Sequence, residues 1–138
     1  MRQVGLALEI AFDSNSSKIV IAYRDSGNSN YGSAIVGTVS GTSISFGTKT
    51  TFASEAVDWL AMDFDTTNNK VLIMYDAGAS AGKGIVGTVS GTSISFGTAA
   101  TFKATSVDDI KVVYGSSEKF FTFIFEDVSD GKDGKLNT

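Results

Sequence analysis

Hydrophobic and polar residues alternate along most of this chain with a period of two. In the first such segment, one side of the expected strand carries Leu6, Leu8, Ile10 and Phe12, and the other side carries Ala7, Glu9 and Ala11. The alternation returns in "KIVIAY" at residues 18–23 and in "SISF" at residues 43–46. A period of two is typical of β-strands with one buried face. No segment keeps helical spacing, so the pattern predicts an all-β protein.

A repeat organises these strands. The segment "IVGTVSGTSISFGT" occurs twice, at residues 35–48 and again fifty positions later at residues 85–98. Its flanks also match, because residues 11–27 resemble residues 63–79 and residues 51–64 resemble residues 101–114. The chain therefore contains slightly less than three copies of a unit of about fifty residues, and the third copy becomes degenerate after Tyr114.

Each unit is expected to contain four antiparallel strands. The predicted strands are residues 4–12, 18–23, 34–39 and 43–52 in the first unit, 57–64, 70–75, 84–89 and 93–102 in the second, and 107–114 and 120–125 in the third, with 135–138 as a short additional strand. "SGTS" places Gly at the first central position of a two-residue hairpin, as a type II′ turn requires. Within this hairpin, Val39, Ile44 and Phe46 are expected in the core.

Four strands at a period of about fifty residues are typical of β-propeller blades. A solenoid usually has a shorter period, and a β-sandwich does not need near-identical repeats. The prediction is one all-β domain over residues 1–138, with blades at about 4–52, 57–102 and 107–138 and the last blade incomplete.

Fewer than three blades cannot close a ring, since known propellers have about four to eight. An open fan would expose the apolar faces of its two end blades, and such faces are normally buried in an interface. The sequence therefore predicts a homo-oligomer, most simply a two-fold dimer that forms a six-blade ring. The alternative is that the chain is a fragment of a longer array.

Composition narrows the possible functions. The net charge of −4 argues against a nucleic-acid partner, and the absence of Cys and His removes thiolate chemistry and the commonest general base and metal ligand. No run approaches the roughly 18 apolar residues of a membrane helix. Because Glu9 interrupts the apolar N-terminal stretch, which also aligns with an internal segment, this stretch is interpreted as mature structure rather than a signal peptide.

No cofactor or metal site is predicted. The acidic run at residues 126–135, "EDVSDGKDGK", fails the calcium-loop template, since Ser129 and Gly131 fall where ligands should be, and it is interpreted as a flexible polar loop.

The candidate functional residues lie in the longer loops, which antiparallel alternation places at one end of the blades. They are Arg24, Asp25, Tyr31, Asp58, Trp59, Asp76 and Asp108. Trp59, the only Trp, sits beside acidic residues in the way that sugar-binding sites combine a stacking ring with hydroxyl-binding groups. The alternative is that Trp59 packs between blades and that Asp58 and Asp108 have equivalent structural roles.

The repeat resembles a known family. "GTVSGTSISFGT", preceded by "KIVIAYRDSGNSNYGSAIVG", is similar to a tandem repeat of about fifty residues in marine environmental (metagenomic) sequences, among them phage structural or tail-fibre-like proteins and bacterial surface proteins. The resemblance covers nearly the whole chain. It implies a propeller-like module with an adhesive role on a virion or a cell surface, and it carries no catalytic residues.

Three functions follow from these observations, in order of preference. The first is a non-catalytic binding or structural module with a carbohydrate ligand, because repeated blades offer equivalent weak sites and multivalency raises avidity. The second is a structural spacer. The third is a carbohydrate-active hydrolase that uses two acidic residues drawn from Asp58, Asp63 and Asp108, although nothing in the sequence selects such a pair.

Overall fold

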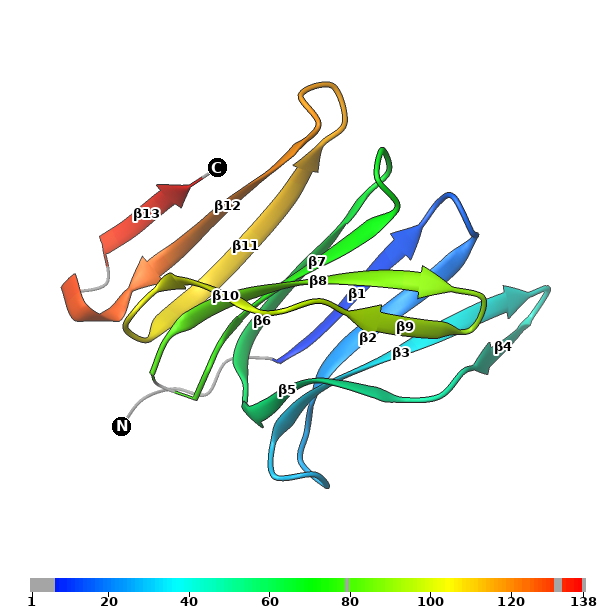
Figure 1. Ribbon diagram of the computed structural model, residues 1–138, viewed down its shortest axis with the longest axis horizontal. Helices are drawn as coiled ribbons and strands as arrows, with labels where there is room; N and C mark the ends of the chain where they lie inside the picture. The colour runs from blue at the N-terminus through cyan, green and yellow to red at the C-terminus, as the bar shows by residue number, and fades with distance from the viewer. Residues whose placement is uncertain (1–6, 79, 131–132, 138) are drawn as a thin grey trace.

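The computed structural model of the protein describes residues 7–78, 80–130 and 133–137, and these residues form three antiparallel sheets, one for each repeat (Figure 1). The first sheet consists of β1 (Leu8–Asp13), β2 (Lys18–Asp25), β3 (Tyr31–Ser40), β4 (Ser43–Phe46) and β5 (Thr50–Ala56). The second consists of β6 (Asp58–Asp65), β7 (Lys70–Asp76), β8 (Gly82–Ser90), β9 (Ser93–Phe96) and β10 (Ala100–Lys103). The third consists of β11 (Val107–Gly115), β12 (Phe120–Asp127) and β13 (Asp133–Asn137).

The predicted all-β architecture of blade-like antiparallel sheets is confirmed. Every predicted strand that falls within the described residues has a counterpart, while residues 4–6 of the first prediction and Thr138 of the last lie outside them. The hairpin turn also agrees with its prediction: Gly41 and Gly91 have φ of 59° and 60°, and the Thr after each is not left-handed, as a type II′ turn requires.

The fourth strand of each unit is not continuous, contrary to the prediction for residues 43–52 and 93–102. Phe46 pairs with Gly37 and Thr50 with Ala34, so three residues on one strand face two on the other. The extra residue breaks the ladder, as a β-bulge does, and divides the strand into β4 and β5. The second sheet repeats this break between β9 and β10.

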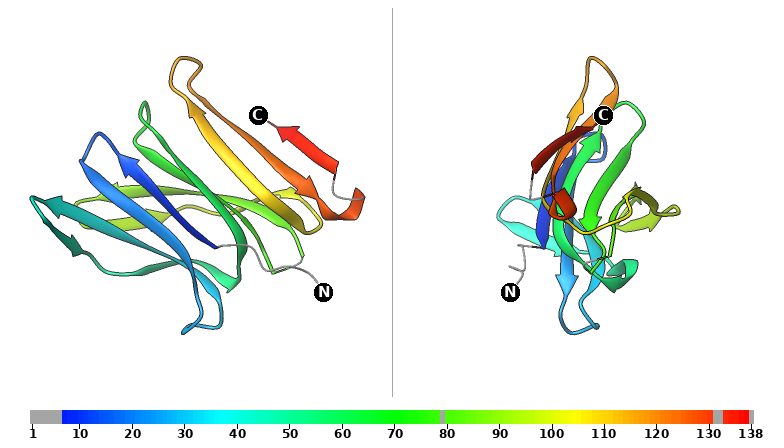
Figure 2. Two further views of the ribbon diagram at one scale, coloured as in Figure 1. Left: turned by 180° about the vertical axis from the view of Figure 1, so that it is seen from behind. Right: turned by 90° about the vertical axis from the view of Figure 1, so that its left-hand side faces the viewer.

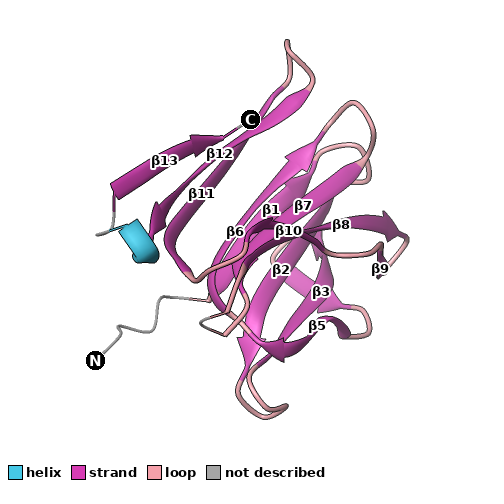
Figure 3. Ribbon diagram, turned by 60° about the vertical axis from the view of Figure 1, so that its left-hand side comes forward, coloured by secondary structure: helices cyan, strands magenta, loops and turns pink. Residues whose placement is uncertain are grey.

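Residues 126–135 also differ from the flexible loop that the sequence predicts. β12 continues to Asp127, a short 3-10 turn (Val128–Asp130) follows, and β13 begins at Asp133 (Figure 3). Asp127 is 2% exposed, and its carboxylate accepts hydrogen bonds from the backbone N–H and the hydroxyl of Ser129. A buried strand end with an Asx turn therefore replaces part of the expected loop.

The first and second sheets pack face to face, with large residues of one against small residues of the other. The first sheet contributes Ala11, Val20, Ala22, Ala34 and Val36, which we call its small-residue face. The second sheet contributes Leu60, Met62, Phe64, Val71, Ile73, Tyr75, Ile85 and Ile94, which we call its large-residue face. Because paired residues of antiparallel strands share a face, each set lies on one side of its sheet.

The second and third sheets repeat this arrangement. Ala61 and Met74 of the second sheet pack against Val107, Ile110 and Phe125. The aromatic contacts recur at equivalent positions, and they are Phe52–Tyr75 at 5.5 Å in the first interface and Phe102–Phe125 at 5.2 Å in the second. The repeat therefore encodes one asymmetric interface between neighbouring sheets, which occurs between the first and second sheets and again between the second and third.

The large-residue face of the first sheet has no partner within the described residues. It comprises Leu8, Ile10, Phe12, Ile19, Ile21, Tyr23, Ile35, Val39, Ile44 and Phe46. The expectation that Val39, Ile44 and Phe46 are core is wrong for this copy, since they are 58%, 46% and 51% exposed. Their positions suit a core, but no sheet covers them; in the second copy the equivalent Ile94 is 4% exposed.

The three sheets splay from their first strands. Most contacts between neighbouring sheets involve β1, β6 and β11, which lie side by side, while the first-to-second-strand turns project from one end (Figures 1 and 2). Burial raises the pKa of the Glu9 carboxyl, and the positive charge of Lys111 on β11 acts against this rise.

Candidate functional site

The candidate residues gather at the end of the sheets opposite the first-to-second-strand turns, which point upward in Figure 1. Two kinds of segment meet there: the loops between the second and third strands of a sheet, at residues 26–30 and at residues 77–78 and 80–81, and the connections between sheets, at residue 57 and residues 104–106. The structure thus brings the predicted residues to one end of the molecule.

Arg24 and Asp58 form an ion pair that joins the end of β2 to the start of β6. Asp76, at the end of β7, is fully buried and accepts hydrogen bonds from the backbone N–H of Val107 at 3.0 Å and the hydroxyl of Ser106 at 3.2 Å. In both interfaces, therefore, the last residues of a second strand bind the beginning of the next sheet. These contacts fix the sheets relative to one another.

Asp25 pairs with a residue that the sequence did not single out. Its carboxylate lies 2.6 Å from the Nζ atom of Lys49, and this hydrogen bond is the main reason that the pKa of Asp25 is lowered. Lys103 plays a similar role 2.5 Å from Asp127, where its hydrogen bond, with those of Ser129, lowers the pKa of Asp127 to about 2. The spacing of these pairs, 24 residues in both cases, matches no local motif.

A further pair ties the two complete sheets together. The Nζ atom of Lys83 on β8 lies 2.7 Å from the carboxylate of Glu55 on β5. The side chains of Lys83 and Glu55 both remain partly exposed to solvent. Their ion pair therefore contributes little to stability, on the order of 1 kcal/mol or less.

Trp59 lies in a β-bulge and has a positive φ of 48°. It packs against the core cluster between the second and third sheets, and its Nε1 atom is buried with no hydrogen-bond partner among the described residues. This position agrees with the packing role that the sequence left open for Trp59. Asp108 is 2% exposed and precedes the same kind of bulge, in which Asp109 has φ of 43°.

Tyr31 follows a tight turn in the first of these loops. The backbone N–H of Tyr31 donates to the carbonyl of Asn28 at 3.0 Å, and Ser29 and Asn30 between them have φ of 54° and 62°. Two consecutive left-handed residues define a type I′ turn. The carbonyl of Asn30 in turn accepts from the N–H of Val57 at 3.0 Å, which ties the turn to the connection between sheets.

The third acidic residue considered for hydrolysis also has a role in packing. Asp63 accepts hydrogen bonds from the backbone N–H of Phe64 at 2.8 Å and of Tyr114, on the next sheet, at 2.7 Å. In the part of the chain that the structure describes, no group of three or more acidic side chains is placed to hold a metal ion. Within residues 7–78, 80–130 and 133–137, no helix is long and apolar enough to cross a membrane.

The sequence matches none of the protein-family models against which it was scanned, and a search of curated proteins finds no significant match.

Proposed function

We propose that this chain is a non-catalytic repeat module for binding or structural adhesion, which works by packing its open sheet face onto a further copy of itself. The observation that carries the proposal is the exposure of the large-residue face of the first sheet. Leu8, Ile10 and Phe12 are 59%, 60% and 58% exposed, whereas the equivalent Leu60, Met62 and Phe64 of the second sheet are buried. A contiguous apolar face of this kind marks an interaction site.

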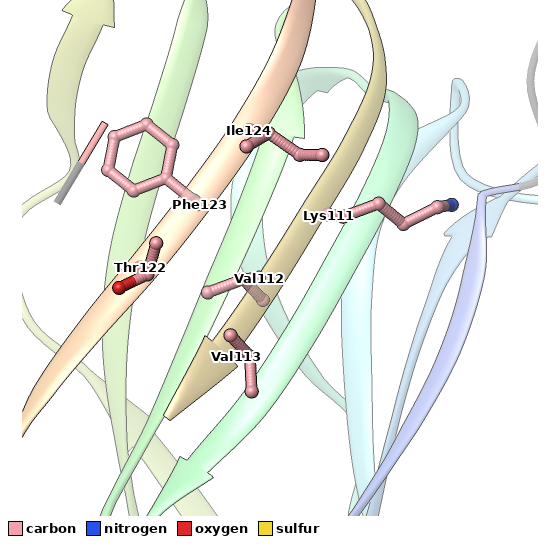
Figure 4. Close-up of a pocket in the computed structure, with 6 residues that line it drawn as sticks. All are labelled: Lys111, Val112, Val113, Thr122, Phe123 and Ile124. Atoms are coloured by element: carbon pink, nitrogen blue, oxygen red, sulfur yellow. The ribbon is translucent and has the colours of Figure 1, made fainter. Parts of the chain in front are cut away.

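The partner that this face fits is a blade of the same kind. In both interfaces within the chain, large residues of one sheet cover the opposite face of the sheet before it. The outer face of the third sheet is the free counterpart within the described residues, and it carries a shallow hollow (Figure 4). Of the residues around this hollow, Lys111, Val113, Thr122 and Ile124 lie on the outer face, whereas Val112 and Phe123 lie on the face toward the second sheet.

Packing of the first sheet of one copy onto the third sheet of another gives a head-to-tail contact. Such a contact forms a closed ring if the rotation between copies closes, and two copies with two equivalent junctions give the six-blade ring. The engagement of Arg24, Asp58, Asp63 and Asp76 in contacts between sheets favours this role over hydrolysis. The resemblance to tail-fibre-like and surface repeats supports a place on a virion or a cell surface.

Sedimentation velocity over a range of protein concentrations tests the proposal. We expect a species of twice the monomer mass, and we expect Ile44→Lys to shift it to monomer because the charge enters the interface. Ser45→Lys is the matched control, since Ser45 is exposed and its side chain points to the opposite side of β4. A wild-type monomer at all concentrations, or equal effects of the two variants, would contradict the proposal.

A glycan at the loop end is the second candidate ligand. The type I′ turn before Tyr31 favours it, because consecutive left-handed residues store strain and such strain concentrates at binding sites. The turn contains Asn28 and Asn30, and the half-buried Tyr31 follows it in the sequence. NMR titration with neutral monosaccharides should shift the amide signals of residues 28–31, and Tyr31→Ala should remove the shifts while Tyr114→Phe should not. The absence of shifts at tens of millimolar sugar would exclude this ligand class.

A further inference from the structure

A second apolar surface lies on the outer part of the second sheet, on the side that the third sheet covers only in part. Among the described residues, the third sheet has three strands where the second has five, and these three cover only part of the second sheet. The surface is a groove lined by uncharged residues, chiefly Leu72, Met74, Gly84, Val86, Phe102 and Phe123.

The repeat itself shows what such a groove holds when it is filled. Val36 and Val86 occupy the same place in identical sequences, yet Val36 is fully buried and Val86 is 44% exposed. Val36 belongs to the core cluster that also contains Ile85 and Ile94, and Phe96 packs against that cluster. The third and fourth strands of the following sheet therefore cover this position in the first interface. In the second interface, no described residues do so.

An open strand edge borders the groove. β13 pairs with residues 123–127 of β12, whereas residues 120–122 of β12 pair only with β11. In the second sheet, the equivalent Val71 and Leu72 pair with Gly87 and Val86 of β8. Residues 120–122 thus present backbone donors and acceptors on one side without a strand among the described residues, and an added strand can pair with such an edge.

We propose that this groove and edge bind a β-hairpin of the repeat type, with small polar residues on one face and Val, Ile and Phe on the other. The template is the β8–β9 hairpin of this chain, whose Ile94 and Phe96 fill the equivalent site of the first interface. The hairpin segment has no charged residue, and neither has the groove, so no charge is desolvated on binding. Main-chain pairing supplies affinity, and the alternate apolar side chains supply specificity.

This site is separate from the face of the first sheet on which the proposed self-association depends. The hairpin binds beside the third sheet and completes its cover of the second, so it requires neither the large-residue face of the first sheet nor a second whole copy. The two proposals can therefore fail independently.

The test uses the full chain labelled with ¹⁵N, in the Ile10→Lys background that keeps the first sheet's open face unoccupied, and the synthetic peptide IVGTVSGTSISFGT as probe. We expect saturable shifts of the amide signals of Val86 and of residues 120–122. A peptide with Ser in place of its second Ile and its Phe should bind at least tenfold more weakly. Val86→Lys should weaken binding at least tenfold, while Val39→Lys, an exposed position on the first sheet, should leave it unchanged.

A tethered version removes any dependence on peptide affinity. The same fourteen residues are joined after Thr138 through a flexible Gly–Ser linker, and amide hydrogen exchange is measured. Slower exchange at residues 120–122, lost on Val86→Lys, supports the proposal. Unchanged exchange in the tethered chain overturns it, as do peptide shifts that map to Val39 and Ile44 instead of the groove.

Discussion

The two copies of "IVGTVSGTSISFGT" allow a stability measurement in which the local sequence is constant and only the surroundings differ. In the first copy Val36 is fully buried and Ile44 is 46% exposed. In the second copy the order is reversed, because Val86 is 44% exposed and Ile94 is 4% exposed. We expect four single alanine substitutions at these positions to show a cost that reverses between the copies.

The magnitudes follow from the carbon atoms removed and their burial. Ile→Ala removes three carbons and Val→Ala removes two, at about 0.8 kcal/mol for each buried methylene equivalent. Scaled by burial, the transfer cost is ~2.3 kcal/mol at Ile94 and ~1.3 at Ile44, and ~1.6 at Val36 and ~0.9 at Val86. An enclosed cavity adds about 1 kcal/mol at the two buried positions only. Val→Ala is thus the costlier change in the first copy, and Ile→Ala in the second.

Urea unfolding followed by circular dichroism, at a protein concentration where the chain is monomeric, measures these differences. The reasoning is refuted if the isoleucine substitution is the costlier one in both copies. Concentration adds a second readout, because self-association through the first sheet would bury Ile44. The cost of Ile44→Ala should then rise with protein concentration, while the cost of Ile94→Ala should not.

Two further predictions concern close contacts and charge. A Cβ atom on Gly47 would overlap the carbonyl oxygen of Thr92, whereas a Cβ atom on Gly97 would lie 3.9 Å from its nearest neighbouring atom. Gly47→Ala should therefore destabilise the protein by about 1–3 kcal/mol, and Gly97→Ala by less than about 0.5 kcal/mol. Thermal unfolding of the two variants measures this difference. Lys103 holds the pKa of Asp127 at about 2, below its ordinary value of 3.8. The ionised Asp127 carboxylate therefore stabilises the fold above pH 4, and this stabilisation is lost as the pH falls from about 4 to about 2. Lys103→Met should destabilise the protein at pH 7 and match the wild type near pH 2 in urea unfolding; a difference that is constant with pH would contradict this.

The strand pattern could be predicted because it depends on local information. Alternation fixes which residues share a face, and the repeat carries the boundaries from one copy to the next. The prediction failed where neighbours decide the outcome. Whether Ile44 is core depends on the sheet beside it, and the break after Phe46 depends on one extra residue opposite β3, which the alternation does not reveal.

The candidate site shows the same division. Antiparallel topology alone places Arg24 and Asp58 at one end of the molecule, and the structure joins them as an ion pair. The sequence did not reveal Lys49 or Lys103, because each pairs across strands with an Asp that is distant in the chain. Nor did it choose between ligand binding and packing for Trp59, since an aromatic residue beside Asp fits both, and only the contacts of its ring place it against the core.

The asymmetry of the repeated interface limits how further copies can be added. A large-residue face that packs on a small-residue face cannot pair with itself in the same way, so the proposed self-association requires a head-to-tail contact, which leads either to a ring or to an open array.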